Sequence, residues 1–220
     1  QNGHHEIVKL LLNDERVDRN KTENSLNMTP FYIACQRGQN EIVRLLLNDQ
    51  RVDVNRKNDL GEAPFYVACE KGQTDVVRML LDNKRVETNV SLSDGVTPLF
   101  IACQNGHIEF VQHILSNERE LDINKKCHNT LTALDISKER SNSIRKFNLE
   151  TEEEFQKAKK NCPIIVVLLE SFQKNPNEIR TKLRKQLGLP RTIFSFLFFL
   201  FFFFFPFSFS FFFFISLVLF

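Results

Sequence analysis

Three segments of this 220-residue chain repeat one another in register, and this repetition constrains the fold more than any other feature. They read MTPFYIACQRGQNEIVRLLLND from Met28, EAPFYVACEKGQTDVVRMLLDN from Glu62 and VTPLFIACQNGHIEFVQHILSN from Val96. Their prolines, at 30, 64 and 98, and their glycines, at 38, 72 and 106, recur every 34 residues. A shorter match, QNGHHEIVKLLLN, opens the chain. Self-similarity at such a period indicates a stack of like supersecondary units.

Local chemistry predicts two helices and a loop in each unit. Thr29 is suited to cap a helix over residues 30–37, since proline at the first helical position loses no hydrogen bond. Gly38 can end that helix in the left-handed conformation. Residues 41–48 carry a wide apolar face with acidic Glu41 in the first turn, which predicts a second, antiparallel helix. The turn-rich stretch 58–61 favours a projecting hairpin.

One such unit cannot cover its own apolar face, so neighbouring units must stack and share a core. The pattern Gly-x-Thr-Pro-Leu-x-x-Ala, then Gly-His, Ile-Val-x-x-Leu-Leu and Val-Asp-Val-Asn, resembles the ankyrin repeat over about residues 1–141 and 164–170. The resemblance implies an all-α ankyrin-repeat solenoid, with helix-turn-helix units and projecting hairpin loops. It implies a partial repeat at 1–23, full repeats at 24–57, 58–91 and 92–126, and an interrupted terminal repeat at 127–174.

Several positions depart from the family's pattern. Where the family usually has histidine after Thr-Pro-Leu, this chain has Tyr32, Tyr66 and Phe100. We expect these aromatic residues to keep the bulk of the histidine but to lose the hydrogen bond that ties neighbouring loops. Ala63 replaces a threonine, and Asn27 replaces a glycine, which is tolerable because asparagine adopts left-handed backbone better than most residues.

The fourth unit is interrupted. It begins at residues 132–136, but its second apolar pattern returns only at 164–169. The insertion, residues 142–160, carries acidic residues at 150–154 and then three lysines, an order that favours a helix. Two interpretations stay open: a solvated helical excursion on the last repeat, or a docking element for a partner.

Three cysteines recur at even spacing, which raises the question of a metal site or a disulfide. Cys35, Cys69 and Cys103 all directly follow an alanine in the first helix of a unit, where cysteine acts as a small hydrophobe. One unit of the stack separates each from the next, about 10 Å in packed helices, which is too far for a disulfide. We therefore predict that they are packing residues.

Catalytic and metal-binding motifs are missing from the sequence. Cys127, Cys162 and the five histidines have no zinc-ligand spacing. There is no Gly-rich phosphate loop, no Gly-x-Ser-x-Gly and no His-Glu-x-x-His. We expect a protein that is not an enzyme and that holds no metal and no cofactor.

The partner expected from these features is a protein. The net charge of +2, with basic and acidic residues interspersed, argues against nucleic acid binding. In the ankyrin architecture, the loop tips and the exposed side of each first helix line a concave groove that typically binds proteins. The matching positions are Leu26, Met28, Gln36, Arg37, Asp59, Leu60, Glu62, Glu70, Lys71, Ser93, Asp94, Val96, Gln104 and Asn105. This mixture of apolar, amide and charged side chains suits a protein surface, and we expect a monomer.

The segment 175–191 predicts a short basic amphipathic helix. Asn175 and Pro176 break the chain before it, and Ile179, Leu183 and Leu187 share one face. It would cap the last repeat, because a solenoid needs an end that meets water; the alternative is an anionic membrane surface.

The last segment, 192–220, has no charged residue and is more than half phenylalanine. It exceeds the ~20 apolar residues that span a bilayer, which predicts a transmembrane anchor that leaves the repeats in the cytoplasm. An alternative stays open, because phenylalanine has T-rich codons: the segment would then be translated non-coding sequence.

The chain opens on Gln1, in the middle of a repeat, so we expect a C-terminal fragment of a longer chain. The function expected from the repeats is a protein-binding module or scaffold. The alternative is a regulatory or targeting segment of a larger enzyme or of a tail-anchored membrane protein.

Overall fold

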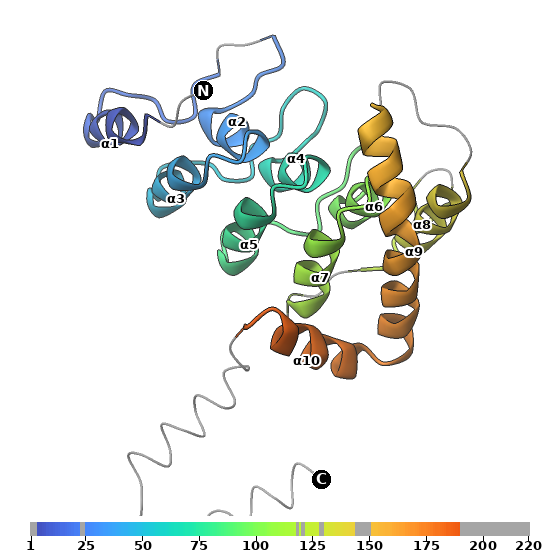
Figure 1. The fold of residues 1–220 in the computed structure, drawn as a ribbon. Coiled ribbons are helices and arrows are strands. Elements are labelled where there is room, and N and C mark those ends of the chain that lie inside the picture. The colour runs from blue at the N-terminus through green and yellow to red at the C-terminus, as the bar shows by residue number, and fades with distance from the viewer. Residues whose placement is uncertain are drawn as a thin grey trace, which may run out of the picture.

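The computed structural model describes residues 4–22, 25–117, 119, 122–127, 130–143 and 151–189, which form ten α-helices and no strand (Figure 1). The helices are α1 (His5–Asn13), α2 (Pro30–Gln36), α3 (Asn40–Asn48), α4 (Pro64–Glu70), α5 (Thr74–Asp82), α6 (Pro98–Gln104), α7 (Ile108–Ser116), α8 (Ala133–Asn142), α9 (Glu152–Lys174) and α10 (Pro176–Gln186).

The helices stack in two rows. The first helices of the units, α2, α4, α6 and α8, form one row, and α1, α3, α5, α7 and α9 form the other (Figure 1). Each first helix packs on the second helix of its own unit and on the first helix of the next. The buried side chains between the rows make one continuous apolar cluster, from Phe31 in α2 to Leu183 in α10. The all-α stack of helix-turn-helix units predicted from the sequence is confirmed.

The helix boundaries follow from local chemistry. The hydroxyl oxygens of Thr29 and Thr97 each accept a hydrogen bond from a backbone N–H in the first turn, at 3.1 Å in both cases. Ala63 provides no such bond, yet α4 still begins at Pro64, because proline fixes a helical φ at the first position. Asn27 has a φ of 54°, so it does adopt the left-handed conformation expected of it.

The three evenly spaced cysteines are packing residues, as predicted. Cys35, Cys69 and Cys103 are free and fully buried in the cluster between the rows. Burial raises the pKa of the Cys103 thiol to about 12 and raises the pKa of the Cys69 thiol well above its usual value. These thiols therefore stay protonated at neutral pH.

The fourth unit differs from the expectation for its insertion. One continuous helix, α9, begins with a capping box between Thr151 and Glu154 and contains both the end of the insertion and the returning apolar pattern. Phe155 and Ala158 are buried, and Asn161 Nδ2 donates to Gly106 O at 2.7 Å. This part of the insertion is therefore not a solvated excursion, because its helix packs against the turn between α6 and α7. Residues 144–150 of the insertion lie outside the described residues.

Helix α10 lies across the C-terminal ends of α7 and α9 (Figure 1). Leu183 is buried there, and Arg180 Nε donates to Asn117 O at 3.2 Å. The Arg180 guanidinium also stacks over the Phe172 ring, 5.5 Å from its centre. These contacts hold α10 against α7 and α9, the second helices of the last two units.

No helix among the described residues is long and apolar enough to span a bilayer. The anchor expected at 192–220 lies outside the described residues.

Candidate protein-binding surface

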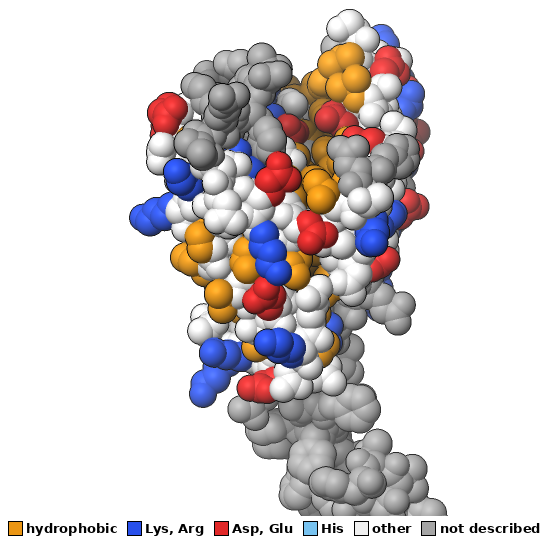
Figure 2. All heavy atoms as spheres, turned by 90° about the vertical axis from the view of Figure 1, so that its right-hand side faces the viewer, with side chains coloured by type: hydrophobic (Ala, Val, Ile, Leu, Met, Phe, Trp, Pro, Cys, Tyr) orange, Lys and Arg blue, Asp and Glu red, His pale blue; other side chains and the backbone are white. Residues whose placement is uncertain are grey.

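The fourteen residues predicted to bind a partner fall on one side of the stack, which we call the inner face. It consists of the loops that precede α2, α4 and α6 and the C-terminal ends of these three helices. Six of the residues have exposed side chains, and the other eight are half-buried. The exposed ones are Arg37, Asp59, Leu60, Lys71, Ser93 and Asp94. Seen from the C-terminal end of the stack, the surface has a hollow at its upper edge, with acidic and apolar side chains along it (Figure 2).

Tyr32 ties the first full unit to the loop of the second. Its hydroxyl donates to Glu62 Oε2 at 2.6 Å and accepts from Asn58 Nδ2 at 3.2 Å, and Asn58 Nδ2 also donates to Glu62 Oε2 at 2.8 Å. The expectation that tyrosine loses the bond between loops is therefore wrong at this position, because the phenolic oxygen extends beyond the ring to the carboxylate. Burial, and then the Glu62 carboxylate, hold the pKa of Tyr32 far above its usual value. Glu62 is thus a structural residue as well as a predicted binding residue.

A second set of hydrogen bonds joins the ends of the first helices. In each case a side chain of the following unit reaches the backbone carbonyl of the last residue of the first helix. Gln73 Nε2 donates to Gln36 O at 3.1 Å, and His107 Nε2 lies 2.9 Å from Glu70 O. In the last unit Arg140 Nε donates to Gln104 O at 3.1 Å. The predicted binding residues Gln36, Glu70 and Gln104 thus take part in fixing the spacing between units through their backbones.

Three arginines that were not predicted as functional residues join the units on the other side of the stack. Arg51, Arg85 and Arg119 are 34 residues apart and donate to backbone carbonyls of the preceding unit. Arg85 Nη1 reaches Leu47 O and Asp49 O, both at 3.2 Å. Their recurrence at the repeat period was the signal that could have found them.

The hydrogen bond that Tyr32 makes to the next loop is not repeated at Tyr66. Tyr66 occupies the position of Tyr32 one unit later, and the next loop carries Leu92 and Val96 where the preceding loop has Asn58 and Glu62. Neither Leu92 nor Val96 has a polar side-chain atom. Tyr66 is only 4% exposed, and its hydroxyl makes no hydrogen bond to any described residue. Tyr66 is not among the fourteen residues predicted to bind a partner.

The charges of three predicted binding residues act on this hydroxyl. Burial is the main cause that raises the pKa of Tyr66, and the negative charges of Glu70, Glu62 and Asp94 raise it further. Nevertheless, no group of three or more histidine, cysteine, aspartate or glutamate side chains in the described part of the chain is arranged to hold a metal ion.

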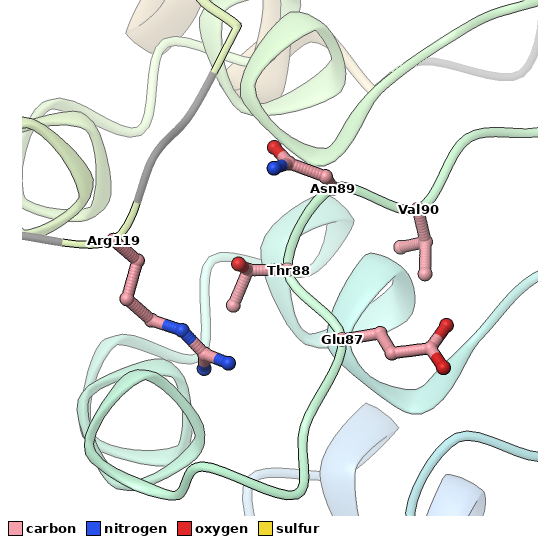
Figure 3. Close-up of a pocket in the computed structure, with 5 residues that line it drawn as sticks. All are labelled: Glu87, Thr88, Asn89, Val90 and Arg119. Atoms are coloured by element: carbon pink, nitrogen blue, oxygen red, sulfur yellow. The ribbon is translucent and has the colours of Figure 1, made fainter.

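Two clefts lie away from the inner face. One, of about 480 Å³, is lined by Glu87, Thr88, Asn89, Val90 and Arg119. Figure 3 shows its Arg119 pointing across toward Thr88, whereas Glu87 and Val90 point away. The other, of about 320 Å³, lies between α5, α7 and the end of α10 and includes His113 and Arg184. None of the fourteen predicted residues lines either of these two clefts.

Ankyrin repeat families match most of the helix pairs of this chain. The family description for ankyrin repeats in three copies matches residues 1–91, and the description for the single ankyrin repeat matches residues 94–127. A search of curated proteins found no match to this chain. Helices α8 to α10 lie beyond the matched residues.

Proposed function

Because this chain belongs to the ankyrin repeat family, whose repeats are generally protein–protein interaction modules, we propose that it binds a partner protein through its inner face. The chain would act as an interaction module rather than as a catalyst.

The proposal is supported by an exposed surface of apolar and charged side chains, which lies on repeat units that hydrogen bonds already hold in place. Leu60 is 57% exposed at its loop, and Arg37, Lys71 and Asp94 are exposed around it on successive units. The Tyr32–Glu62 bond and the bonds to the carbonyls of Gln36 and Glu70 hold these units in register. A surface that is already ordered loses little conformational entropy on binding, which favours affinity.

The charges on the inner face favour a protein over a nucleic acid. Among the fourteen residues four are acidic, namely Asp59, Glu62, Glu70 and Asp94, and only two are basic, Arg37 and Lys71. A phosphate backbone would be repelled by this excess of negative charge. The proposal therefore excludes nucleic acid as the ligand.

We also propose that the module works in a reducing compartment such as the cytoplasm. All five cysteines are buried and none forms a disulfide, as suits a chain that folds in a reducing environment.

Affinity capture with the full 220-residue chain, held in mild detergent because of its apolar tail, tests the proposal. The inner-face variant carries Arg37→Glu, Leu60→Asp and Lys71→Glu. Its matched control carries Arg44→Glu and Arg78→Glu, which are exposed on α3 and α5 in the other row. We expect the wild type and the control to retain the same partner and the inner-face variant to lose it.

Circular dichroism should show the same helix content in all three proteins. Equal capture by the inner-face variant would contradict the proposal.

A further inference from the structure

Helix α9, with 23 residues the longest of the described helices, carries a patch of exposed apolar side chains. Ile164 is 52% exposed and Val167 is 63% exposed, and Pro163 next to them is exposed as well. These residues are neighbours on one side of the helix, because side chains three or four positions apart lie one above the other. Figure 2 faces this end of the stack and shows apolar side chains at the surface among basic and acidic ones.

The patch lies on the side of α9 that points away from the stack. The buried side chains of the helix, from Phe155 to Phe172, follow one another at steps of three or four residues and face the core. At about 3.6 residues per turn, Ile164 and Val167 fall on the opposite side. We call this side, from Glu153 to Lys174, the outer face of α9. Its midpoint lies between Pro163 and Ile164.

The charges of the outer face complement those of a second copy of the same face. Glu153 and Lys174 lie equally far from the midpoint on opposite sides of it, and so do Lys157 and Glu170. In an antiparallel pair of α9 helices, related by a two-fold axis through the midpoint, Glu153 of one copy faces Lys174 of the other. Lys157 of one copy likewise faces Glu170 of the other. The symmetry forms each of these ion pairs twice.

Apolar contacts meet around the axis of such a pair. Pro163 of one copy faces Ile164 of the other, and Val167 faces the aliphatic part of Lys160, whose ammonium can stay in water. The patch that is exposed in a single chain is therefore covered in the pair, and apolar surface is removed from water.

The charged side chains of the outer face are accessible to a second copy. Glu153, Lys157 and Lys174 are exposed and make no ion pair with another described residue. Glu170 pairs with Lys138 of α8 at 2.8 Å, but its side chain is still 42% exposed, so it can accept a second cation.

We propose that the outer face of α9 is the interface of a homodimer, in which two copies pack their α9 helices antiparallel about a two-fold axis through its midpoint. This proposal does not depend on the proposed function, and it differs from the monomer expected from the sequence. One pair of helices buries less surface than a standard interface, so we expect a weak dimer with a Kd on the order of 10 μM.

The dimer adds a property to the proposed function. None of the residues of the outer face belongs to the inner face, so a dimer presents two inner faces at once. Two linked binding surfaces hold a partner that carries repeated motifs more tightly than one surface does.

Sedimentation of the full chain in mild detergent, with charge-reversed variants, tests the dimer. The basic variant carries Glu153→Lys and Glu170→Lys, and the acidic variant carries Lys157→Glu and Lys174→Glu. Each variant alone places like charges at every pair and should self-associate at least about tenfold more weakly than the wild type. An equal mixture restores opposite charges at all four pairs and should associate with an affinity within about threefold of the wild type.

Two controls separate this contact from other causes of association. Glu41→Lys with Glu109→Lys makes the same change of net charge as the basic variant, at exposed positions on α3 and α7, and should leave dimerisation unchanged. All variants keep the apolar segment 192–220, so association through that segment would be equal in every sample. Circular dichroism should show the same helix content throughout.

Three outcomes would contradict the dimer. A wild type that stays monomeric at about ten times the expected Kd would overturn the proposal. Charge variants that associate as tightly as the wild type would also overturn it, because the contact would then lie elsewhere. Loss of association in both variants, without recovery in their mixture, would overturn the antiparallel pairing.

Discussion

The hydroxyl of Tyr32 donates to Glu62 Oε2 over 2.6 Å, so a side chain of one helix pair holds the loop of the next. Thirty-four residues later, Tyr66 has the same ring in the same position and no such acceptor. The same residue type thus joins the units at Tyr32, whereas at Tyr66 its hydroxyl bonds to no described residue.

The first prediction concerns stability at these two tyrosines. Tyr32→Phe should lower the free energy of unfolding by about 1–3 kcal/mol, because a hydrogen bond to the charged carboxylate of Glu62 is lost. Tyr66→Phe is the matched control and should change stability by less than about 0.5 kcal/mol. Urea denaturation followed by circular dichroism measures both. Equal effects in the two variants would show that the Tyr32 bond contributes nothing.

The second prediction concerns the packing of α9 on the turn between α6 and α7. At Gly106, with φ +69°, an added Cβ would lie 2.6 Å from the Cα of Ala158, a backbone atom that cannot move aside easily. Gly61 has φ +78°, but a Cβ there would meet nothing within 4 Å.

Gly61→Ala therefore carries only the cost of a left-handed backbone, about 1 kcal/mol, whereas Gly106→Ala should cost about 2–4 kcal/mol. Hydrogen exchange should also show faster exchange of the α9 amides in Gly106→Ala alone. Unchanged protection of α9 would mean that the helix does not depend on this contact.

The third prediction concerns the arginines that recur at the repeat period. Arg85→Lys should destabilise the chain by about 1–3 kcal/mol, because one ammonium cannot replace a guanidinium that uses both of its arms. Arg85 Nη1 donates to Leu47 O and Asp49 O, and its Nη2 donates to Gln50 O and Val52 O. Arg44→Lys is the matched control, since Arg44 is exposed and, within the described part of the chain, pairs only with Glu41, at 3.8 Å. Thermal unfolding measures the stability of both variants. An Arg85→Lys variant as stable as the wild type would refute the role given to the guanidinium group.

The fourth prediction concerns stability at high pH. The Cys103 thiol has a pKa of about 12 in the fold against an ordinary 9.0, so the folded chain binds more protons than the unfolded chain between these values. The free energy of unfolding should therefore be independent of this thiol below about pH 9 and should fall as the pH rises above it, by up to roughly 1.4 kcal/mol per pH unit. Urea denaturation between pH 8 and pH 11 measures the slope. Cys103→Ala should make the slope shallower, and an unchanged slope would contradict the assignment.

Part of the inner face could be predicted from the sequence because the repeat fixes its positions. Once Pro30, Pro64 and Pro98 mark the starts of equivalent helices, the residues before and after each helix fall in the same relative place in every unit. That register placed Leu60 and Asp94 on the surface correctly. It could not predict that Glu62 accepts a hydrogen bond from Tyr32, because register gives the position of a side chain and not its partner in the neighbouring unit.

The sequence by itself determined the helix pairs, their period and the buried cysteines, since caps, glycine turns and apolar spacing act within a single unit. Only the tertiary structure decided how units fit one another. It decided that Tyr32 reaches Glu62, that Tyr66 reaches no described partner, and that Phe155 and Ala158 are buried where α9 meets the turn between α6 and α7. Each of these depends on side chains from different units meeting across a stack, and the distance between them is set by packing and not by local sequence.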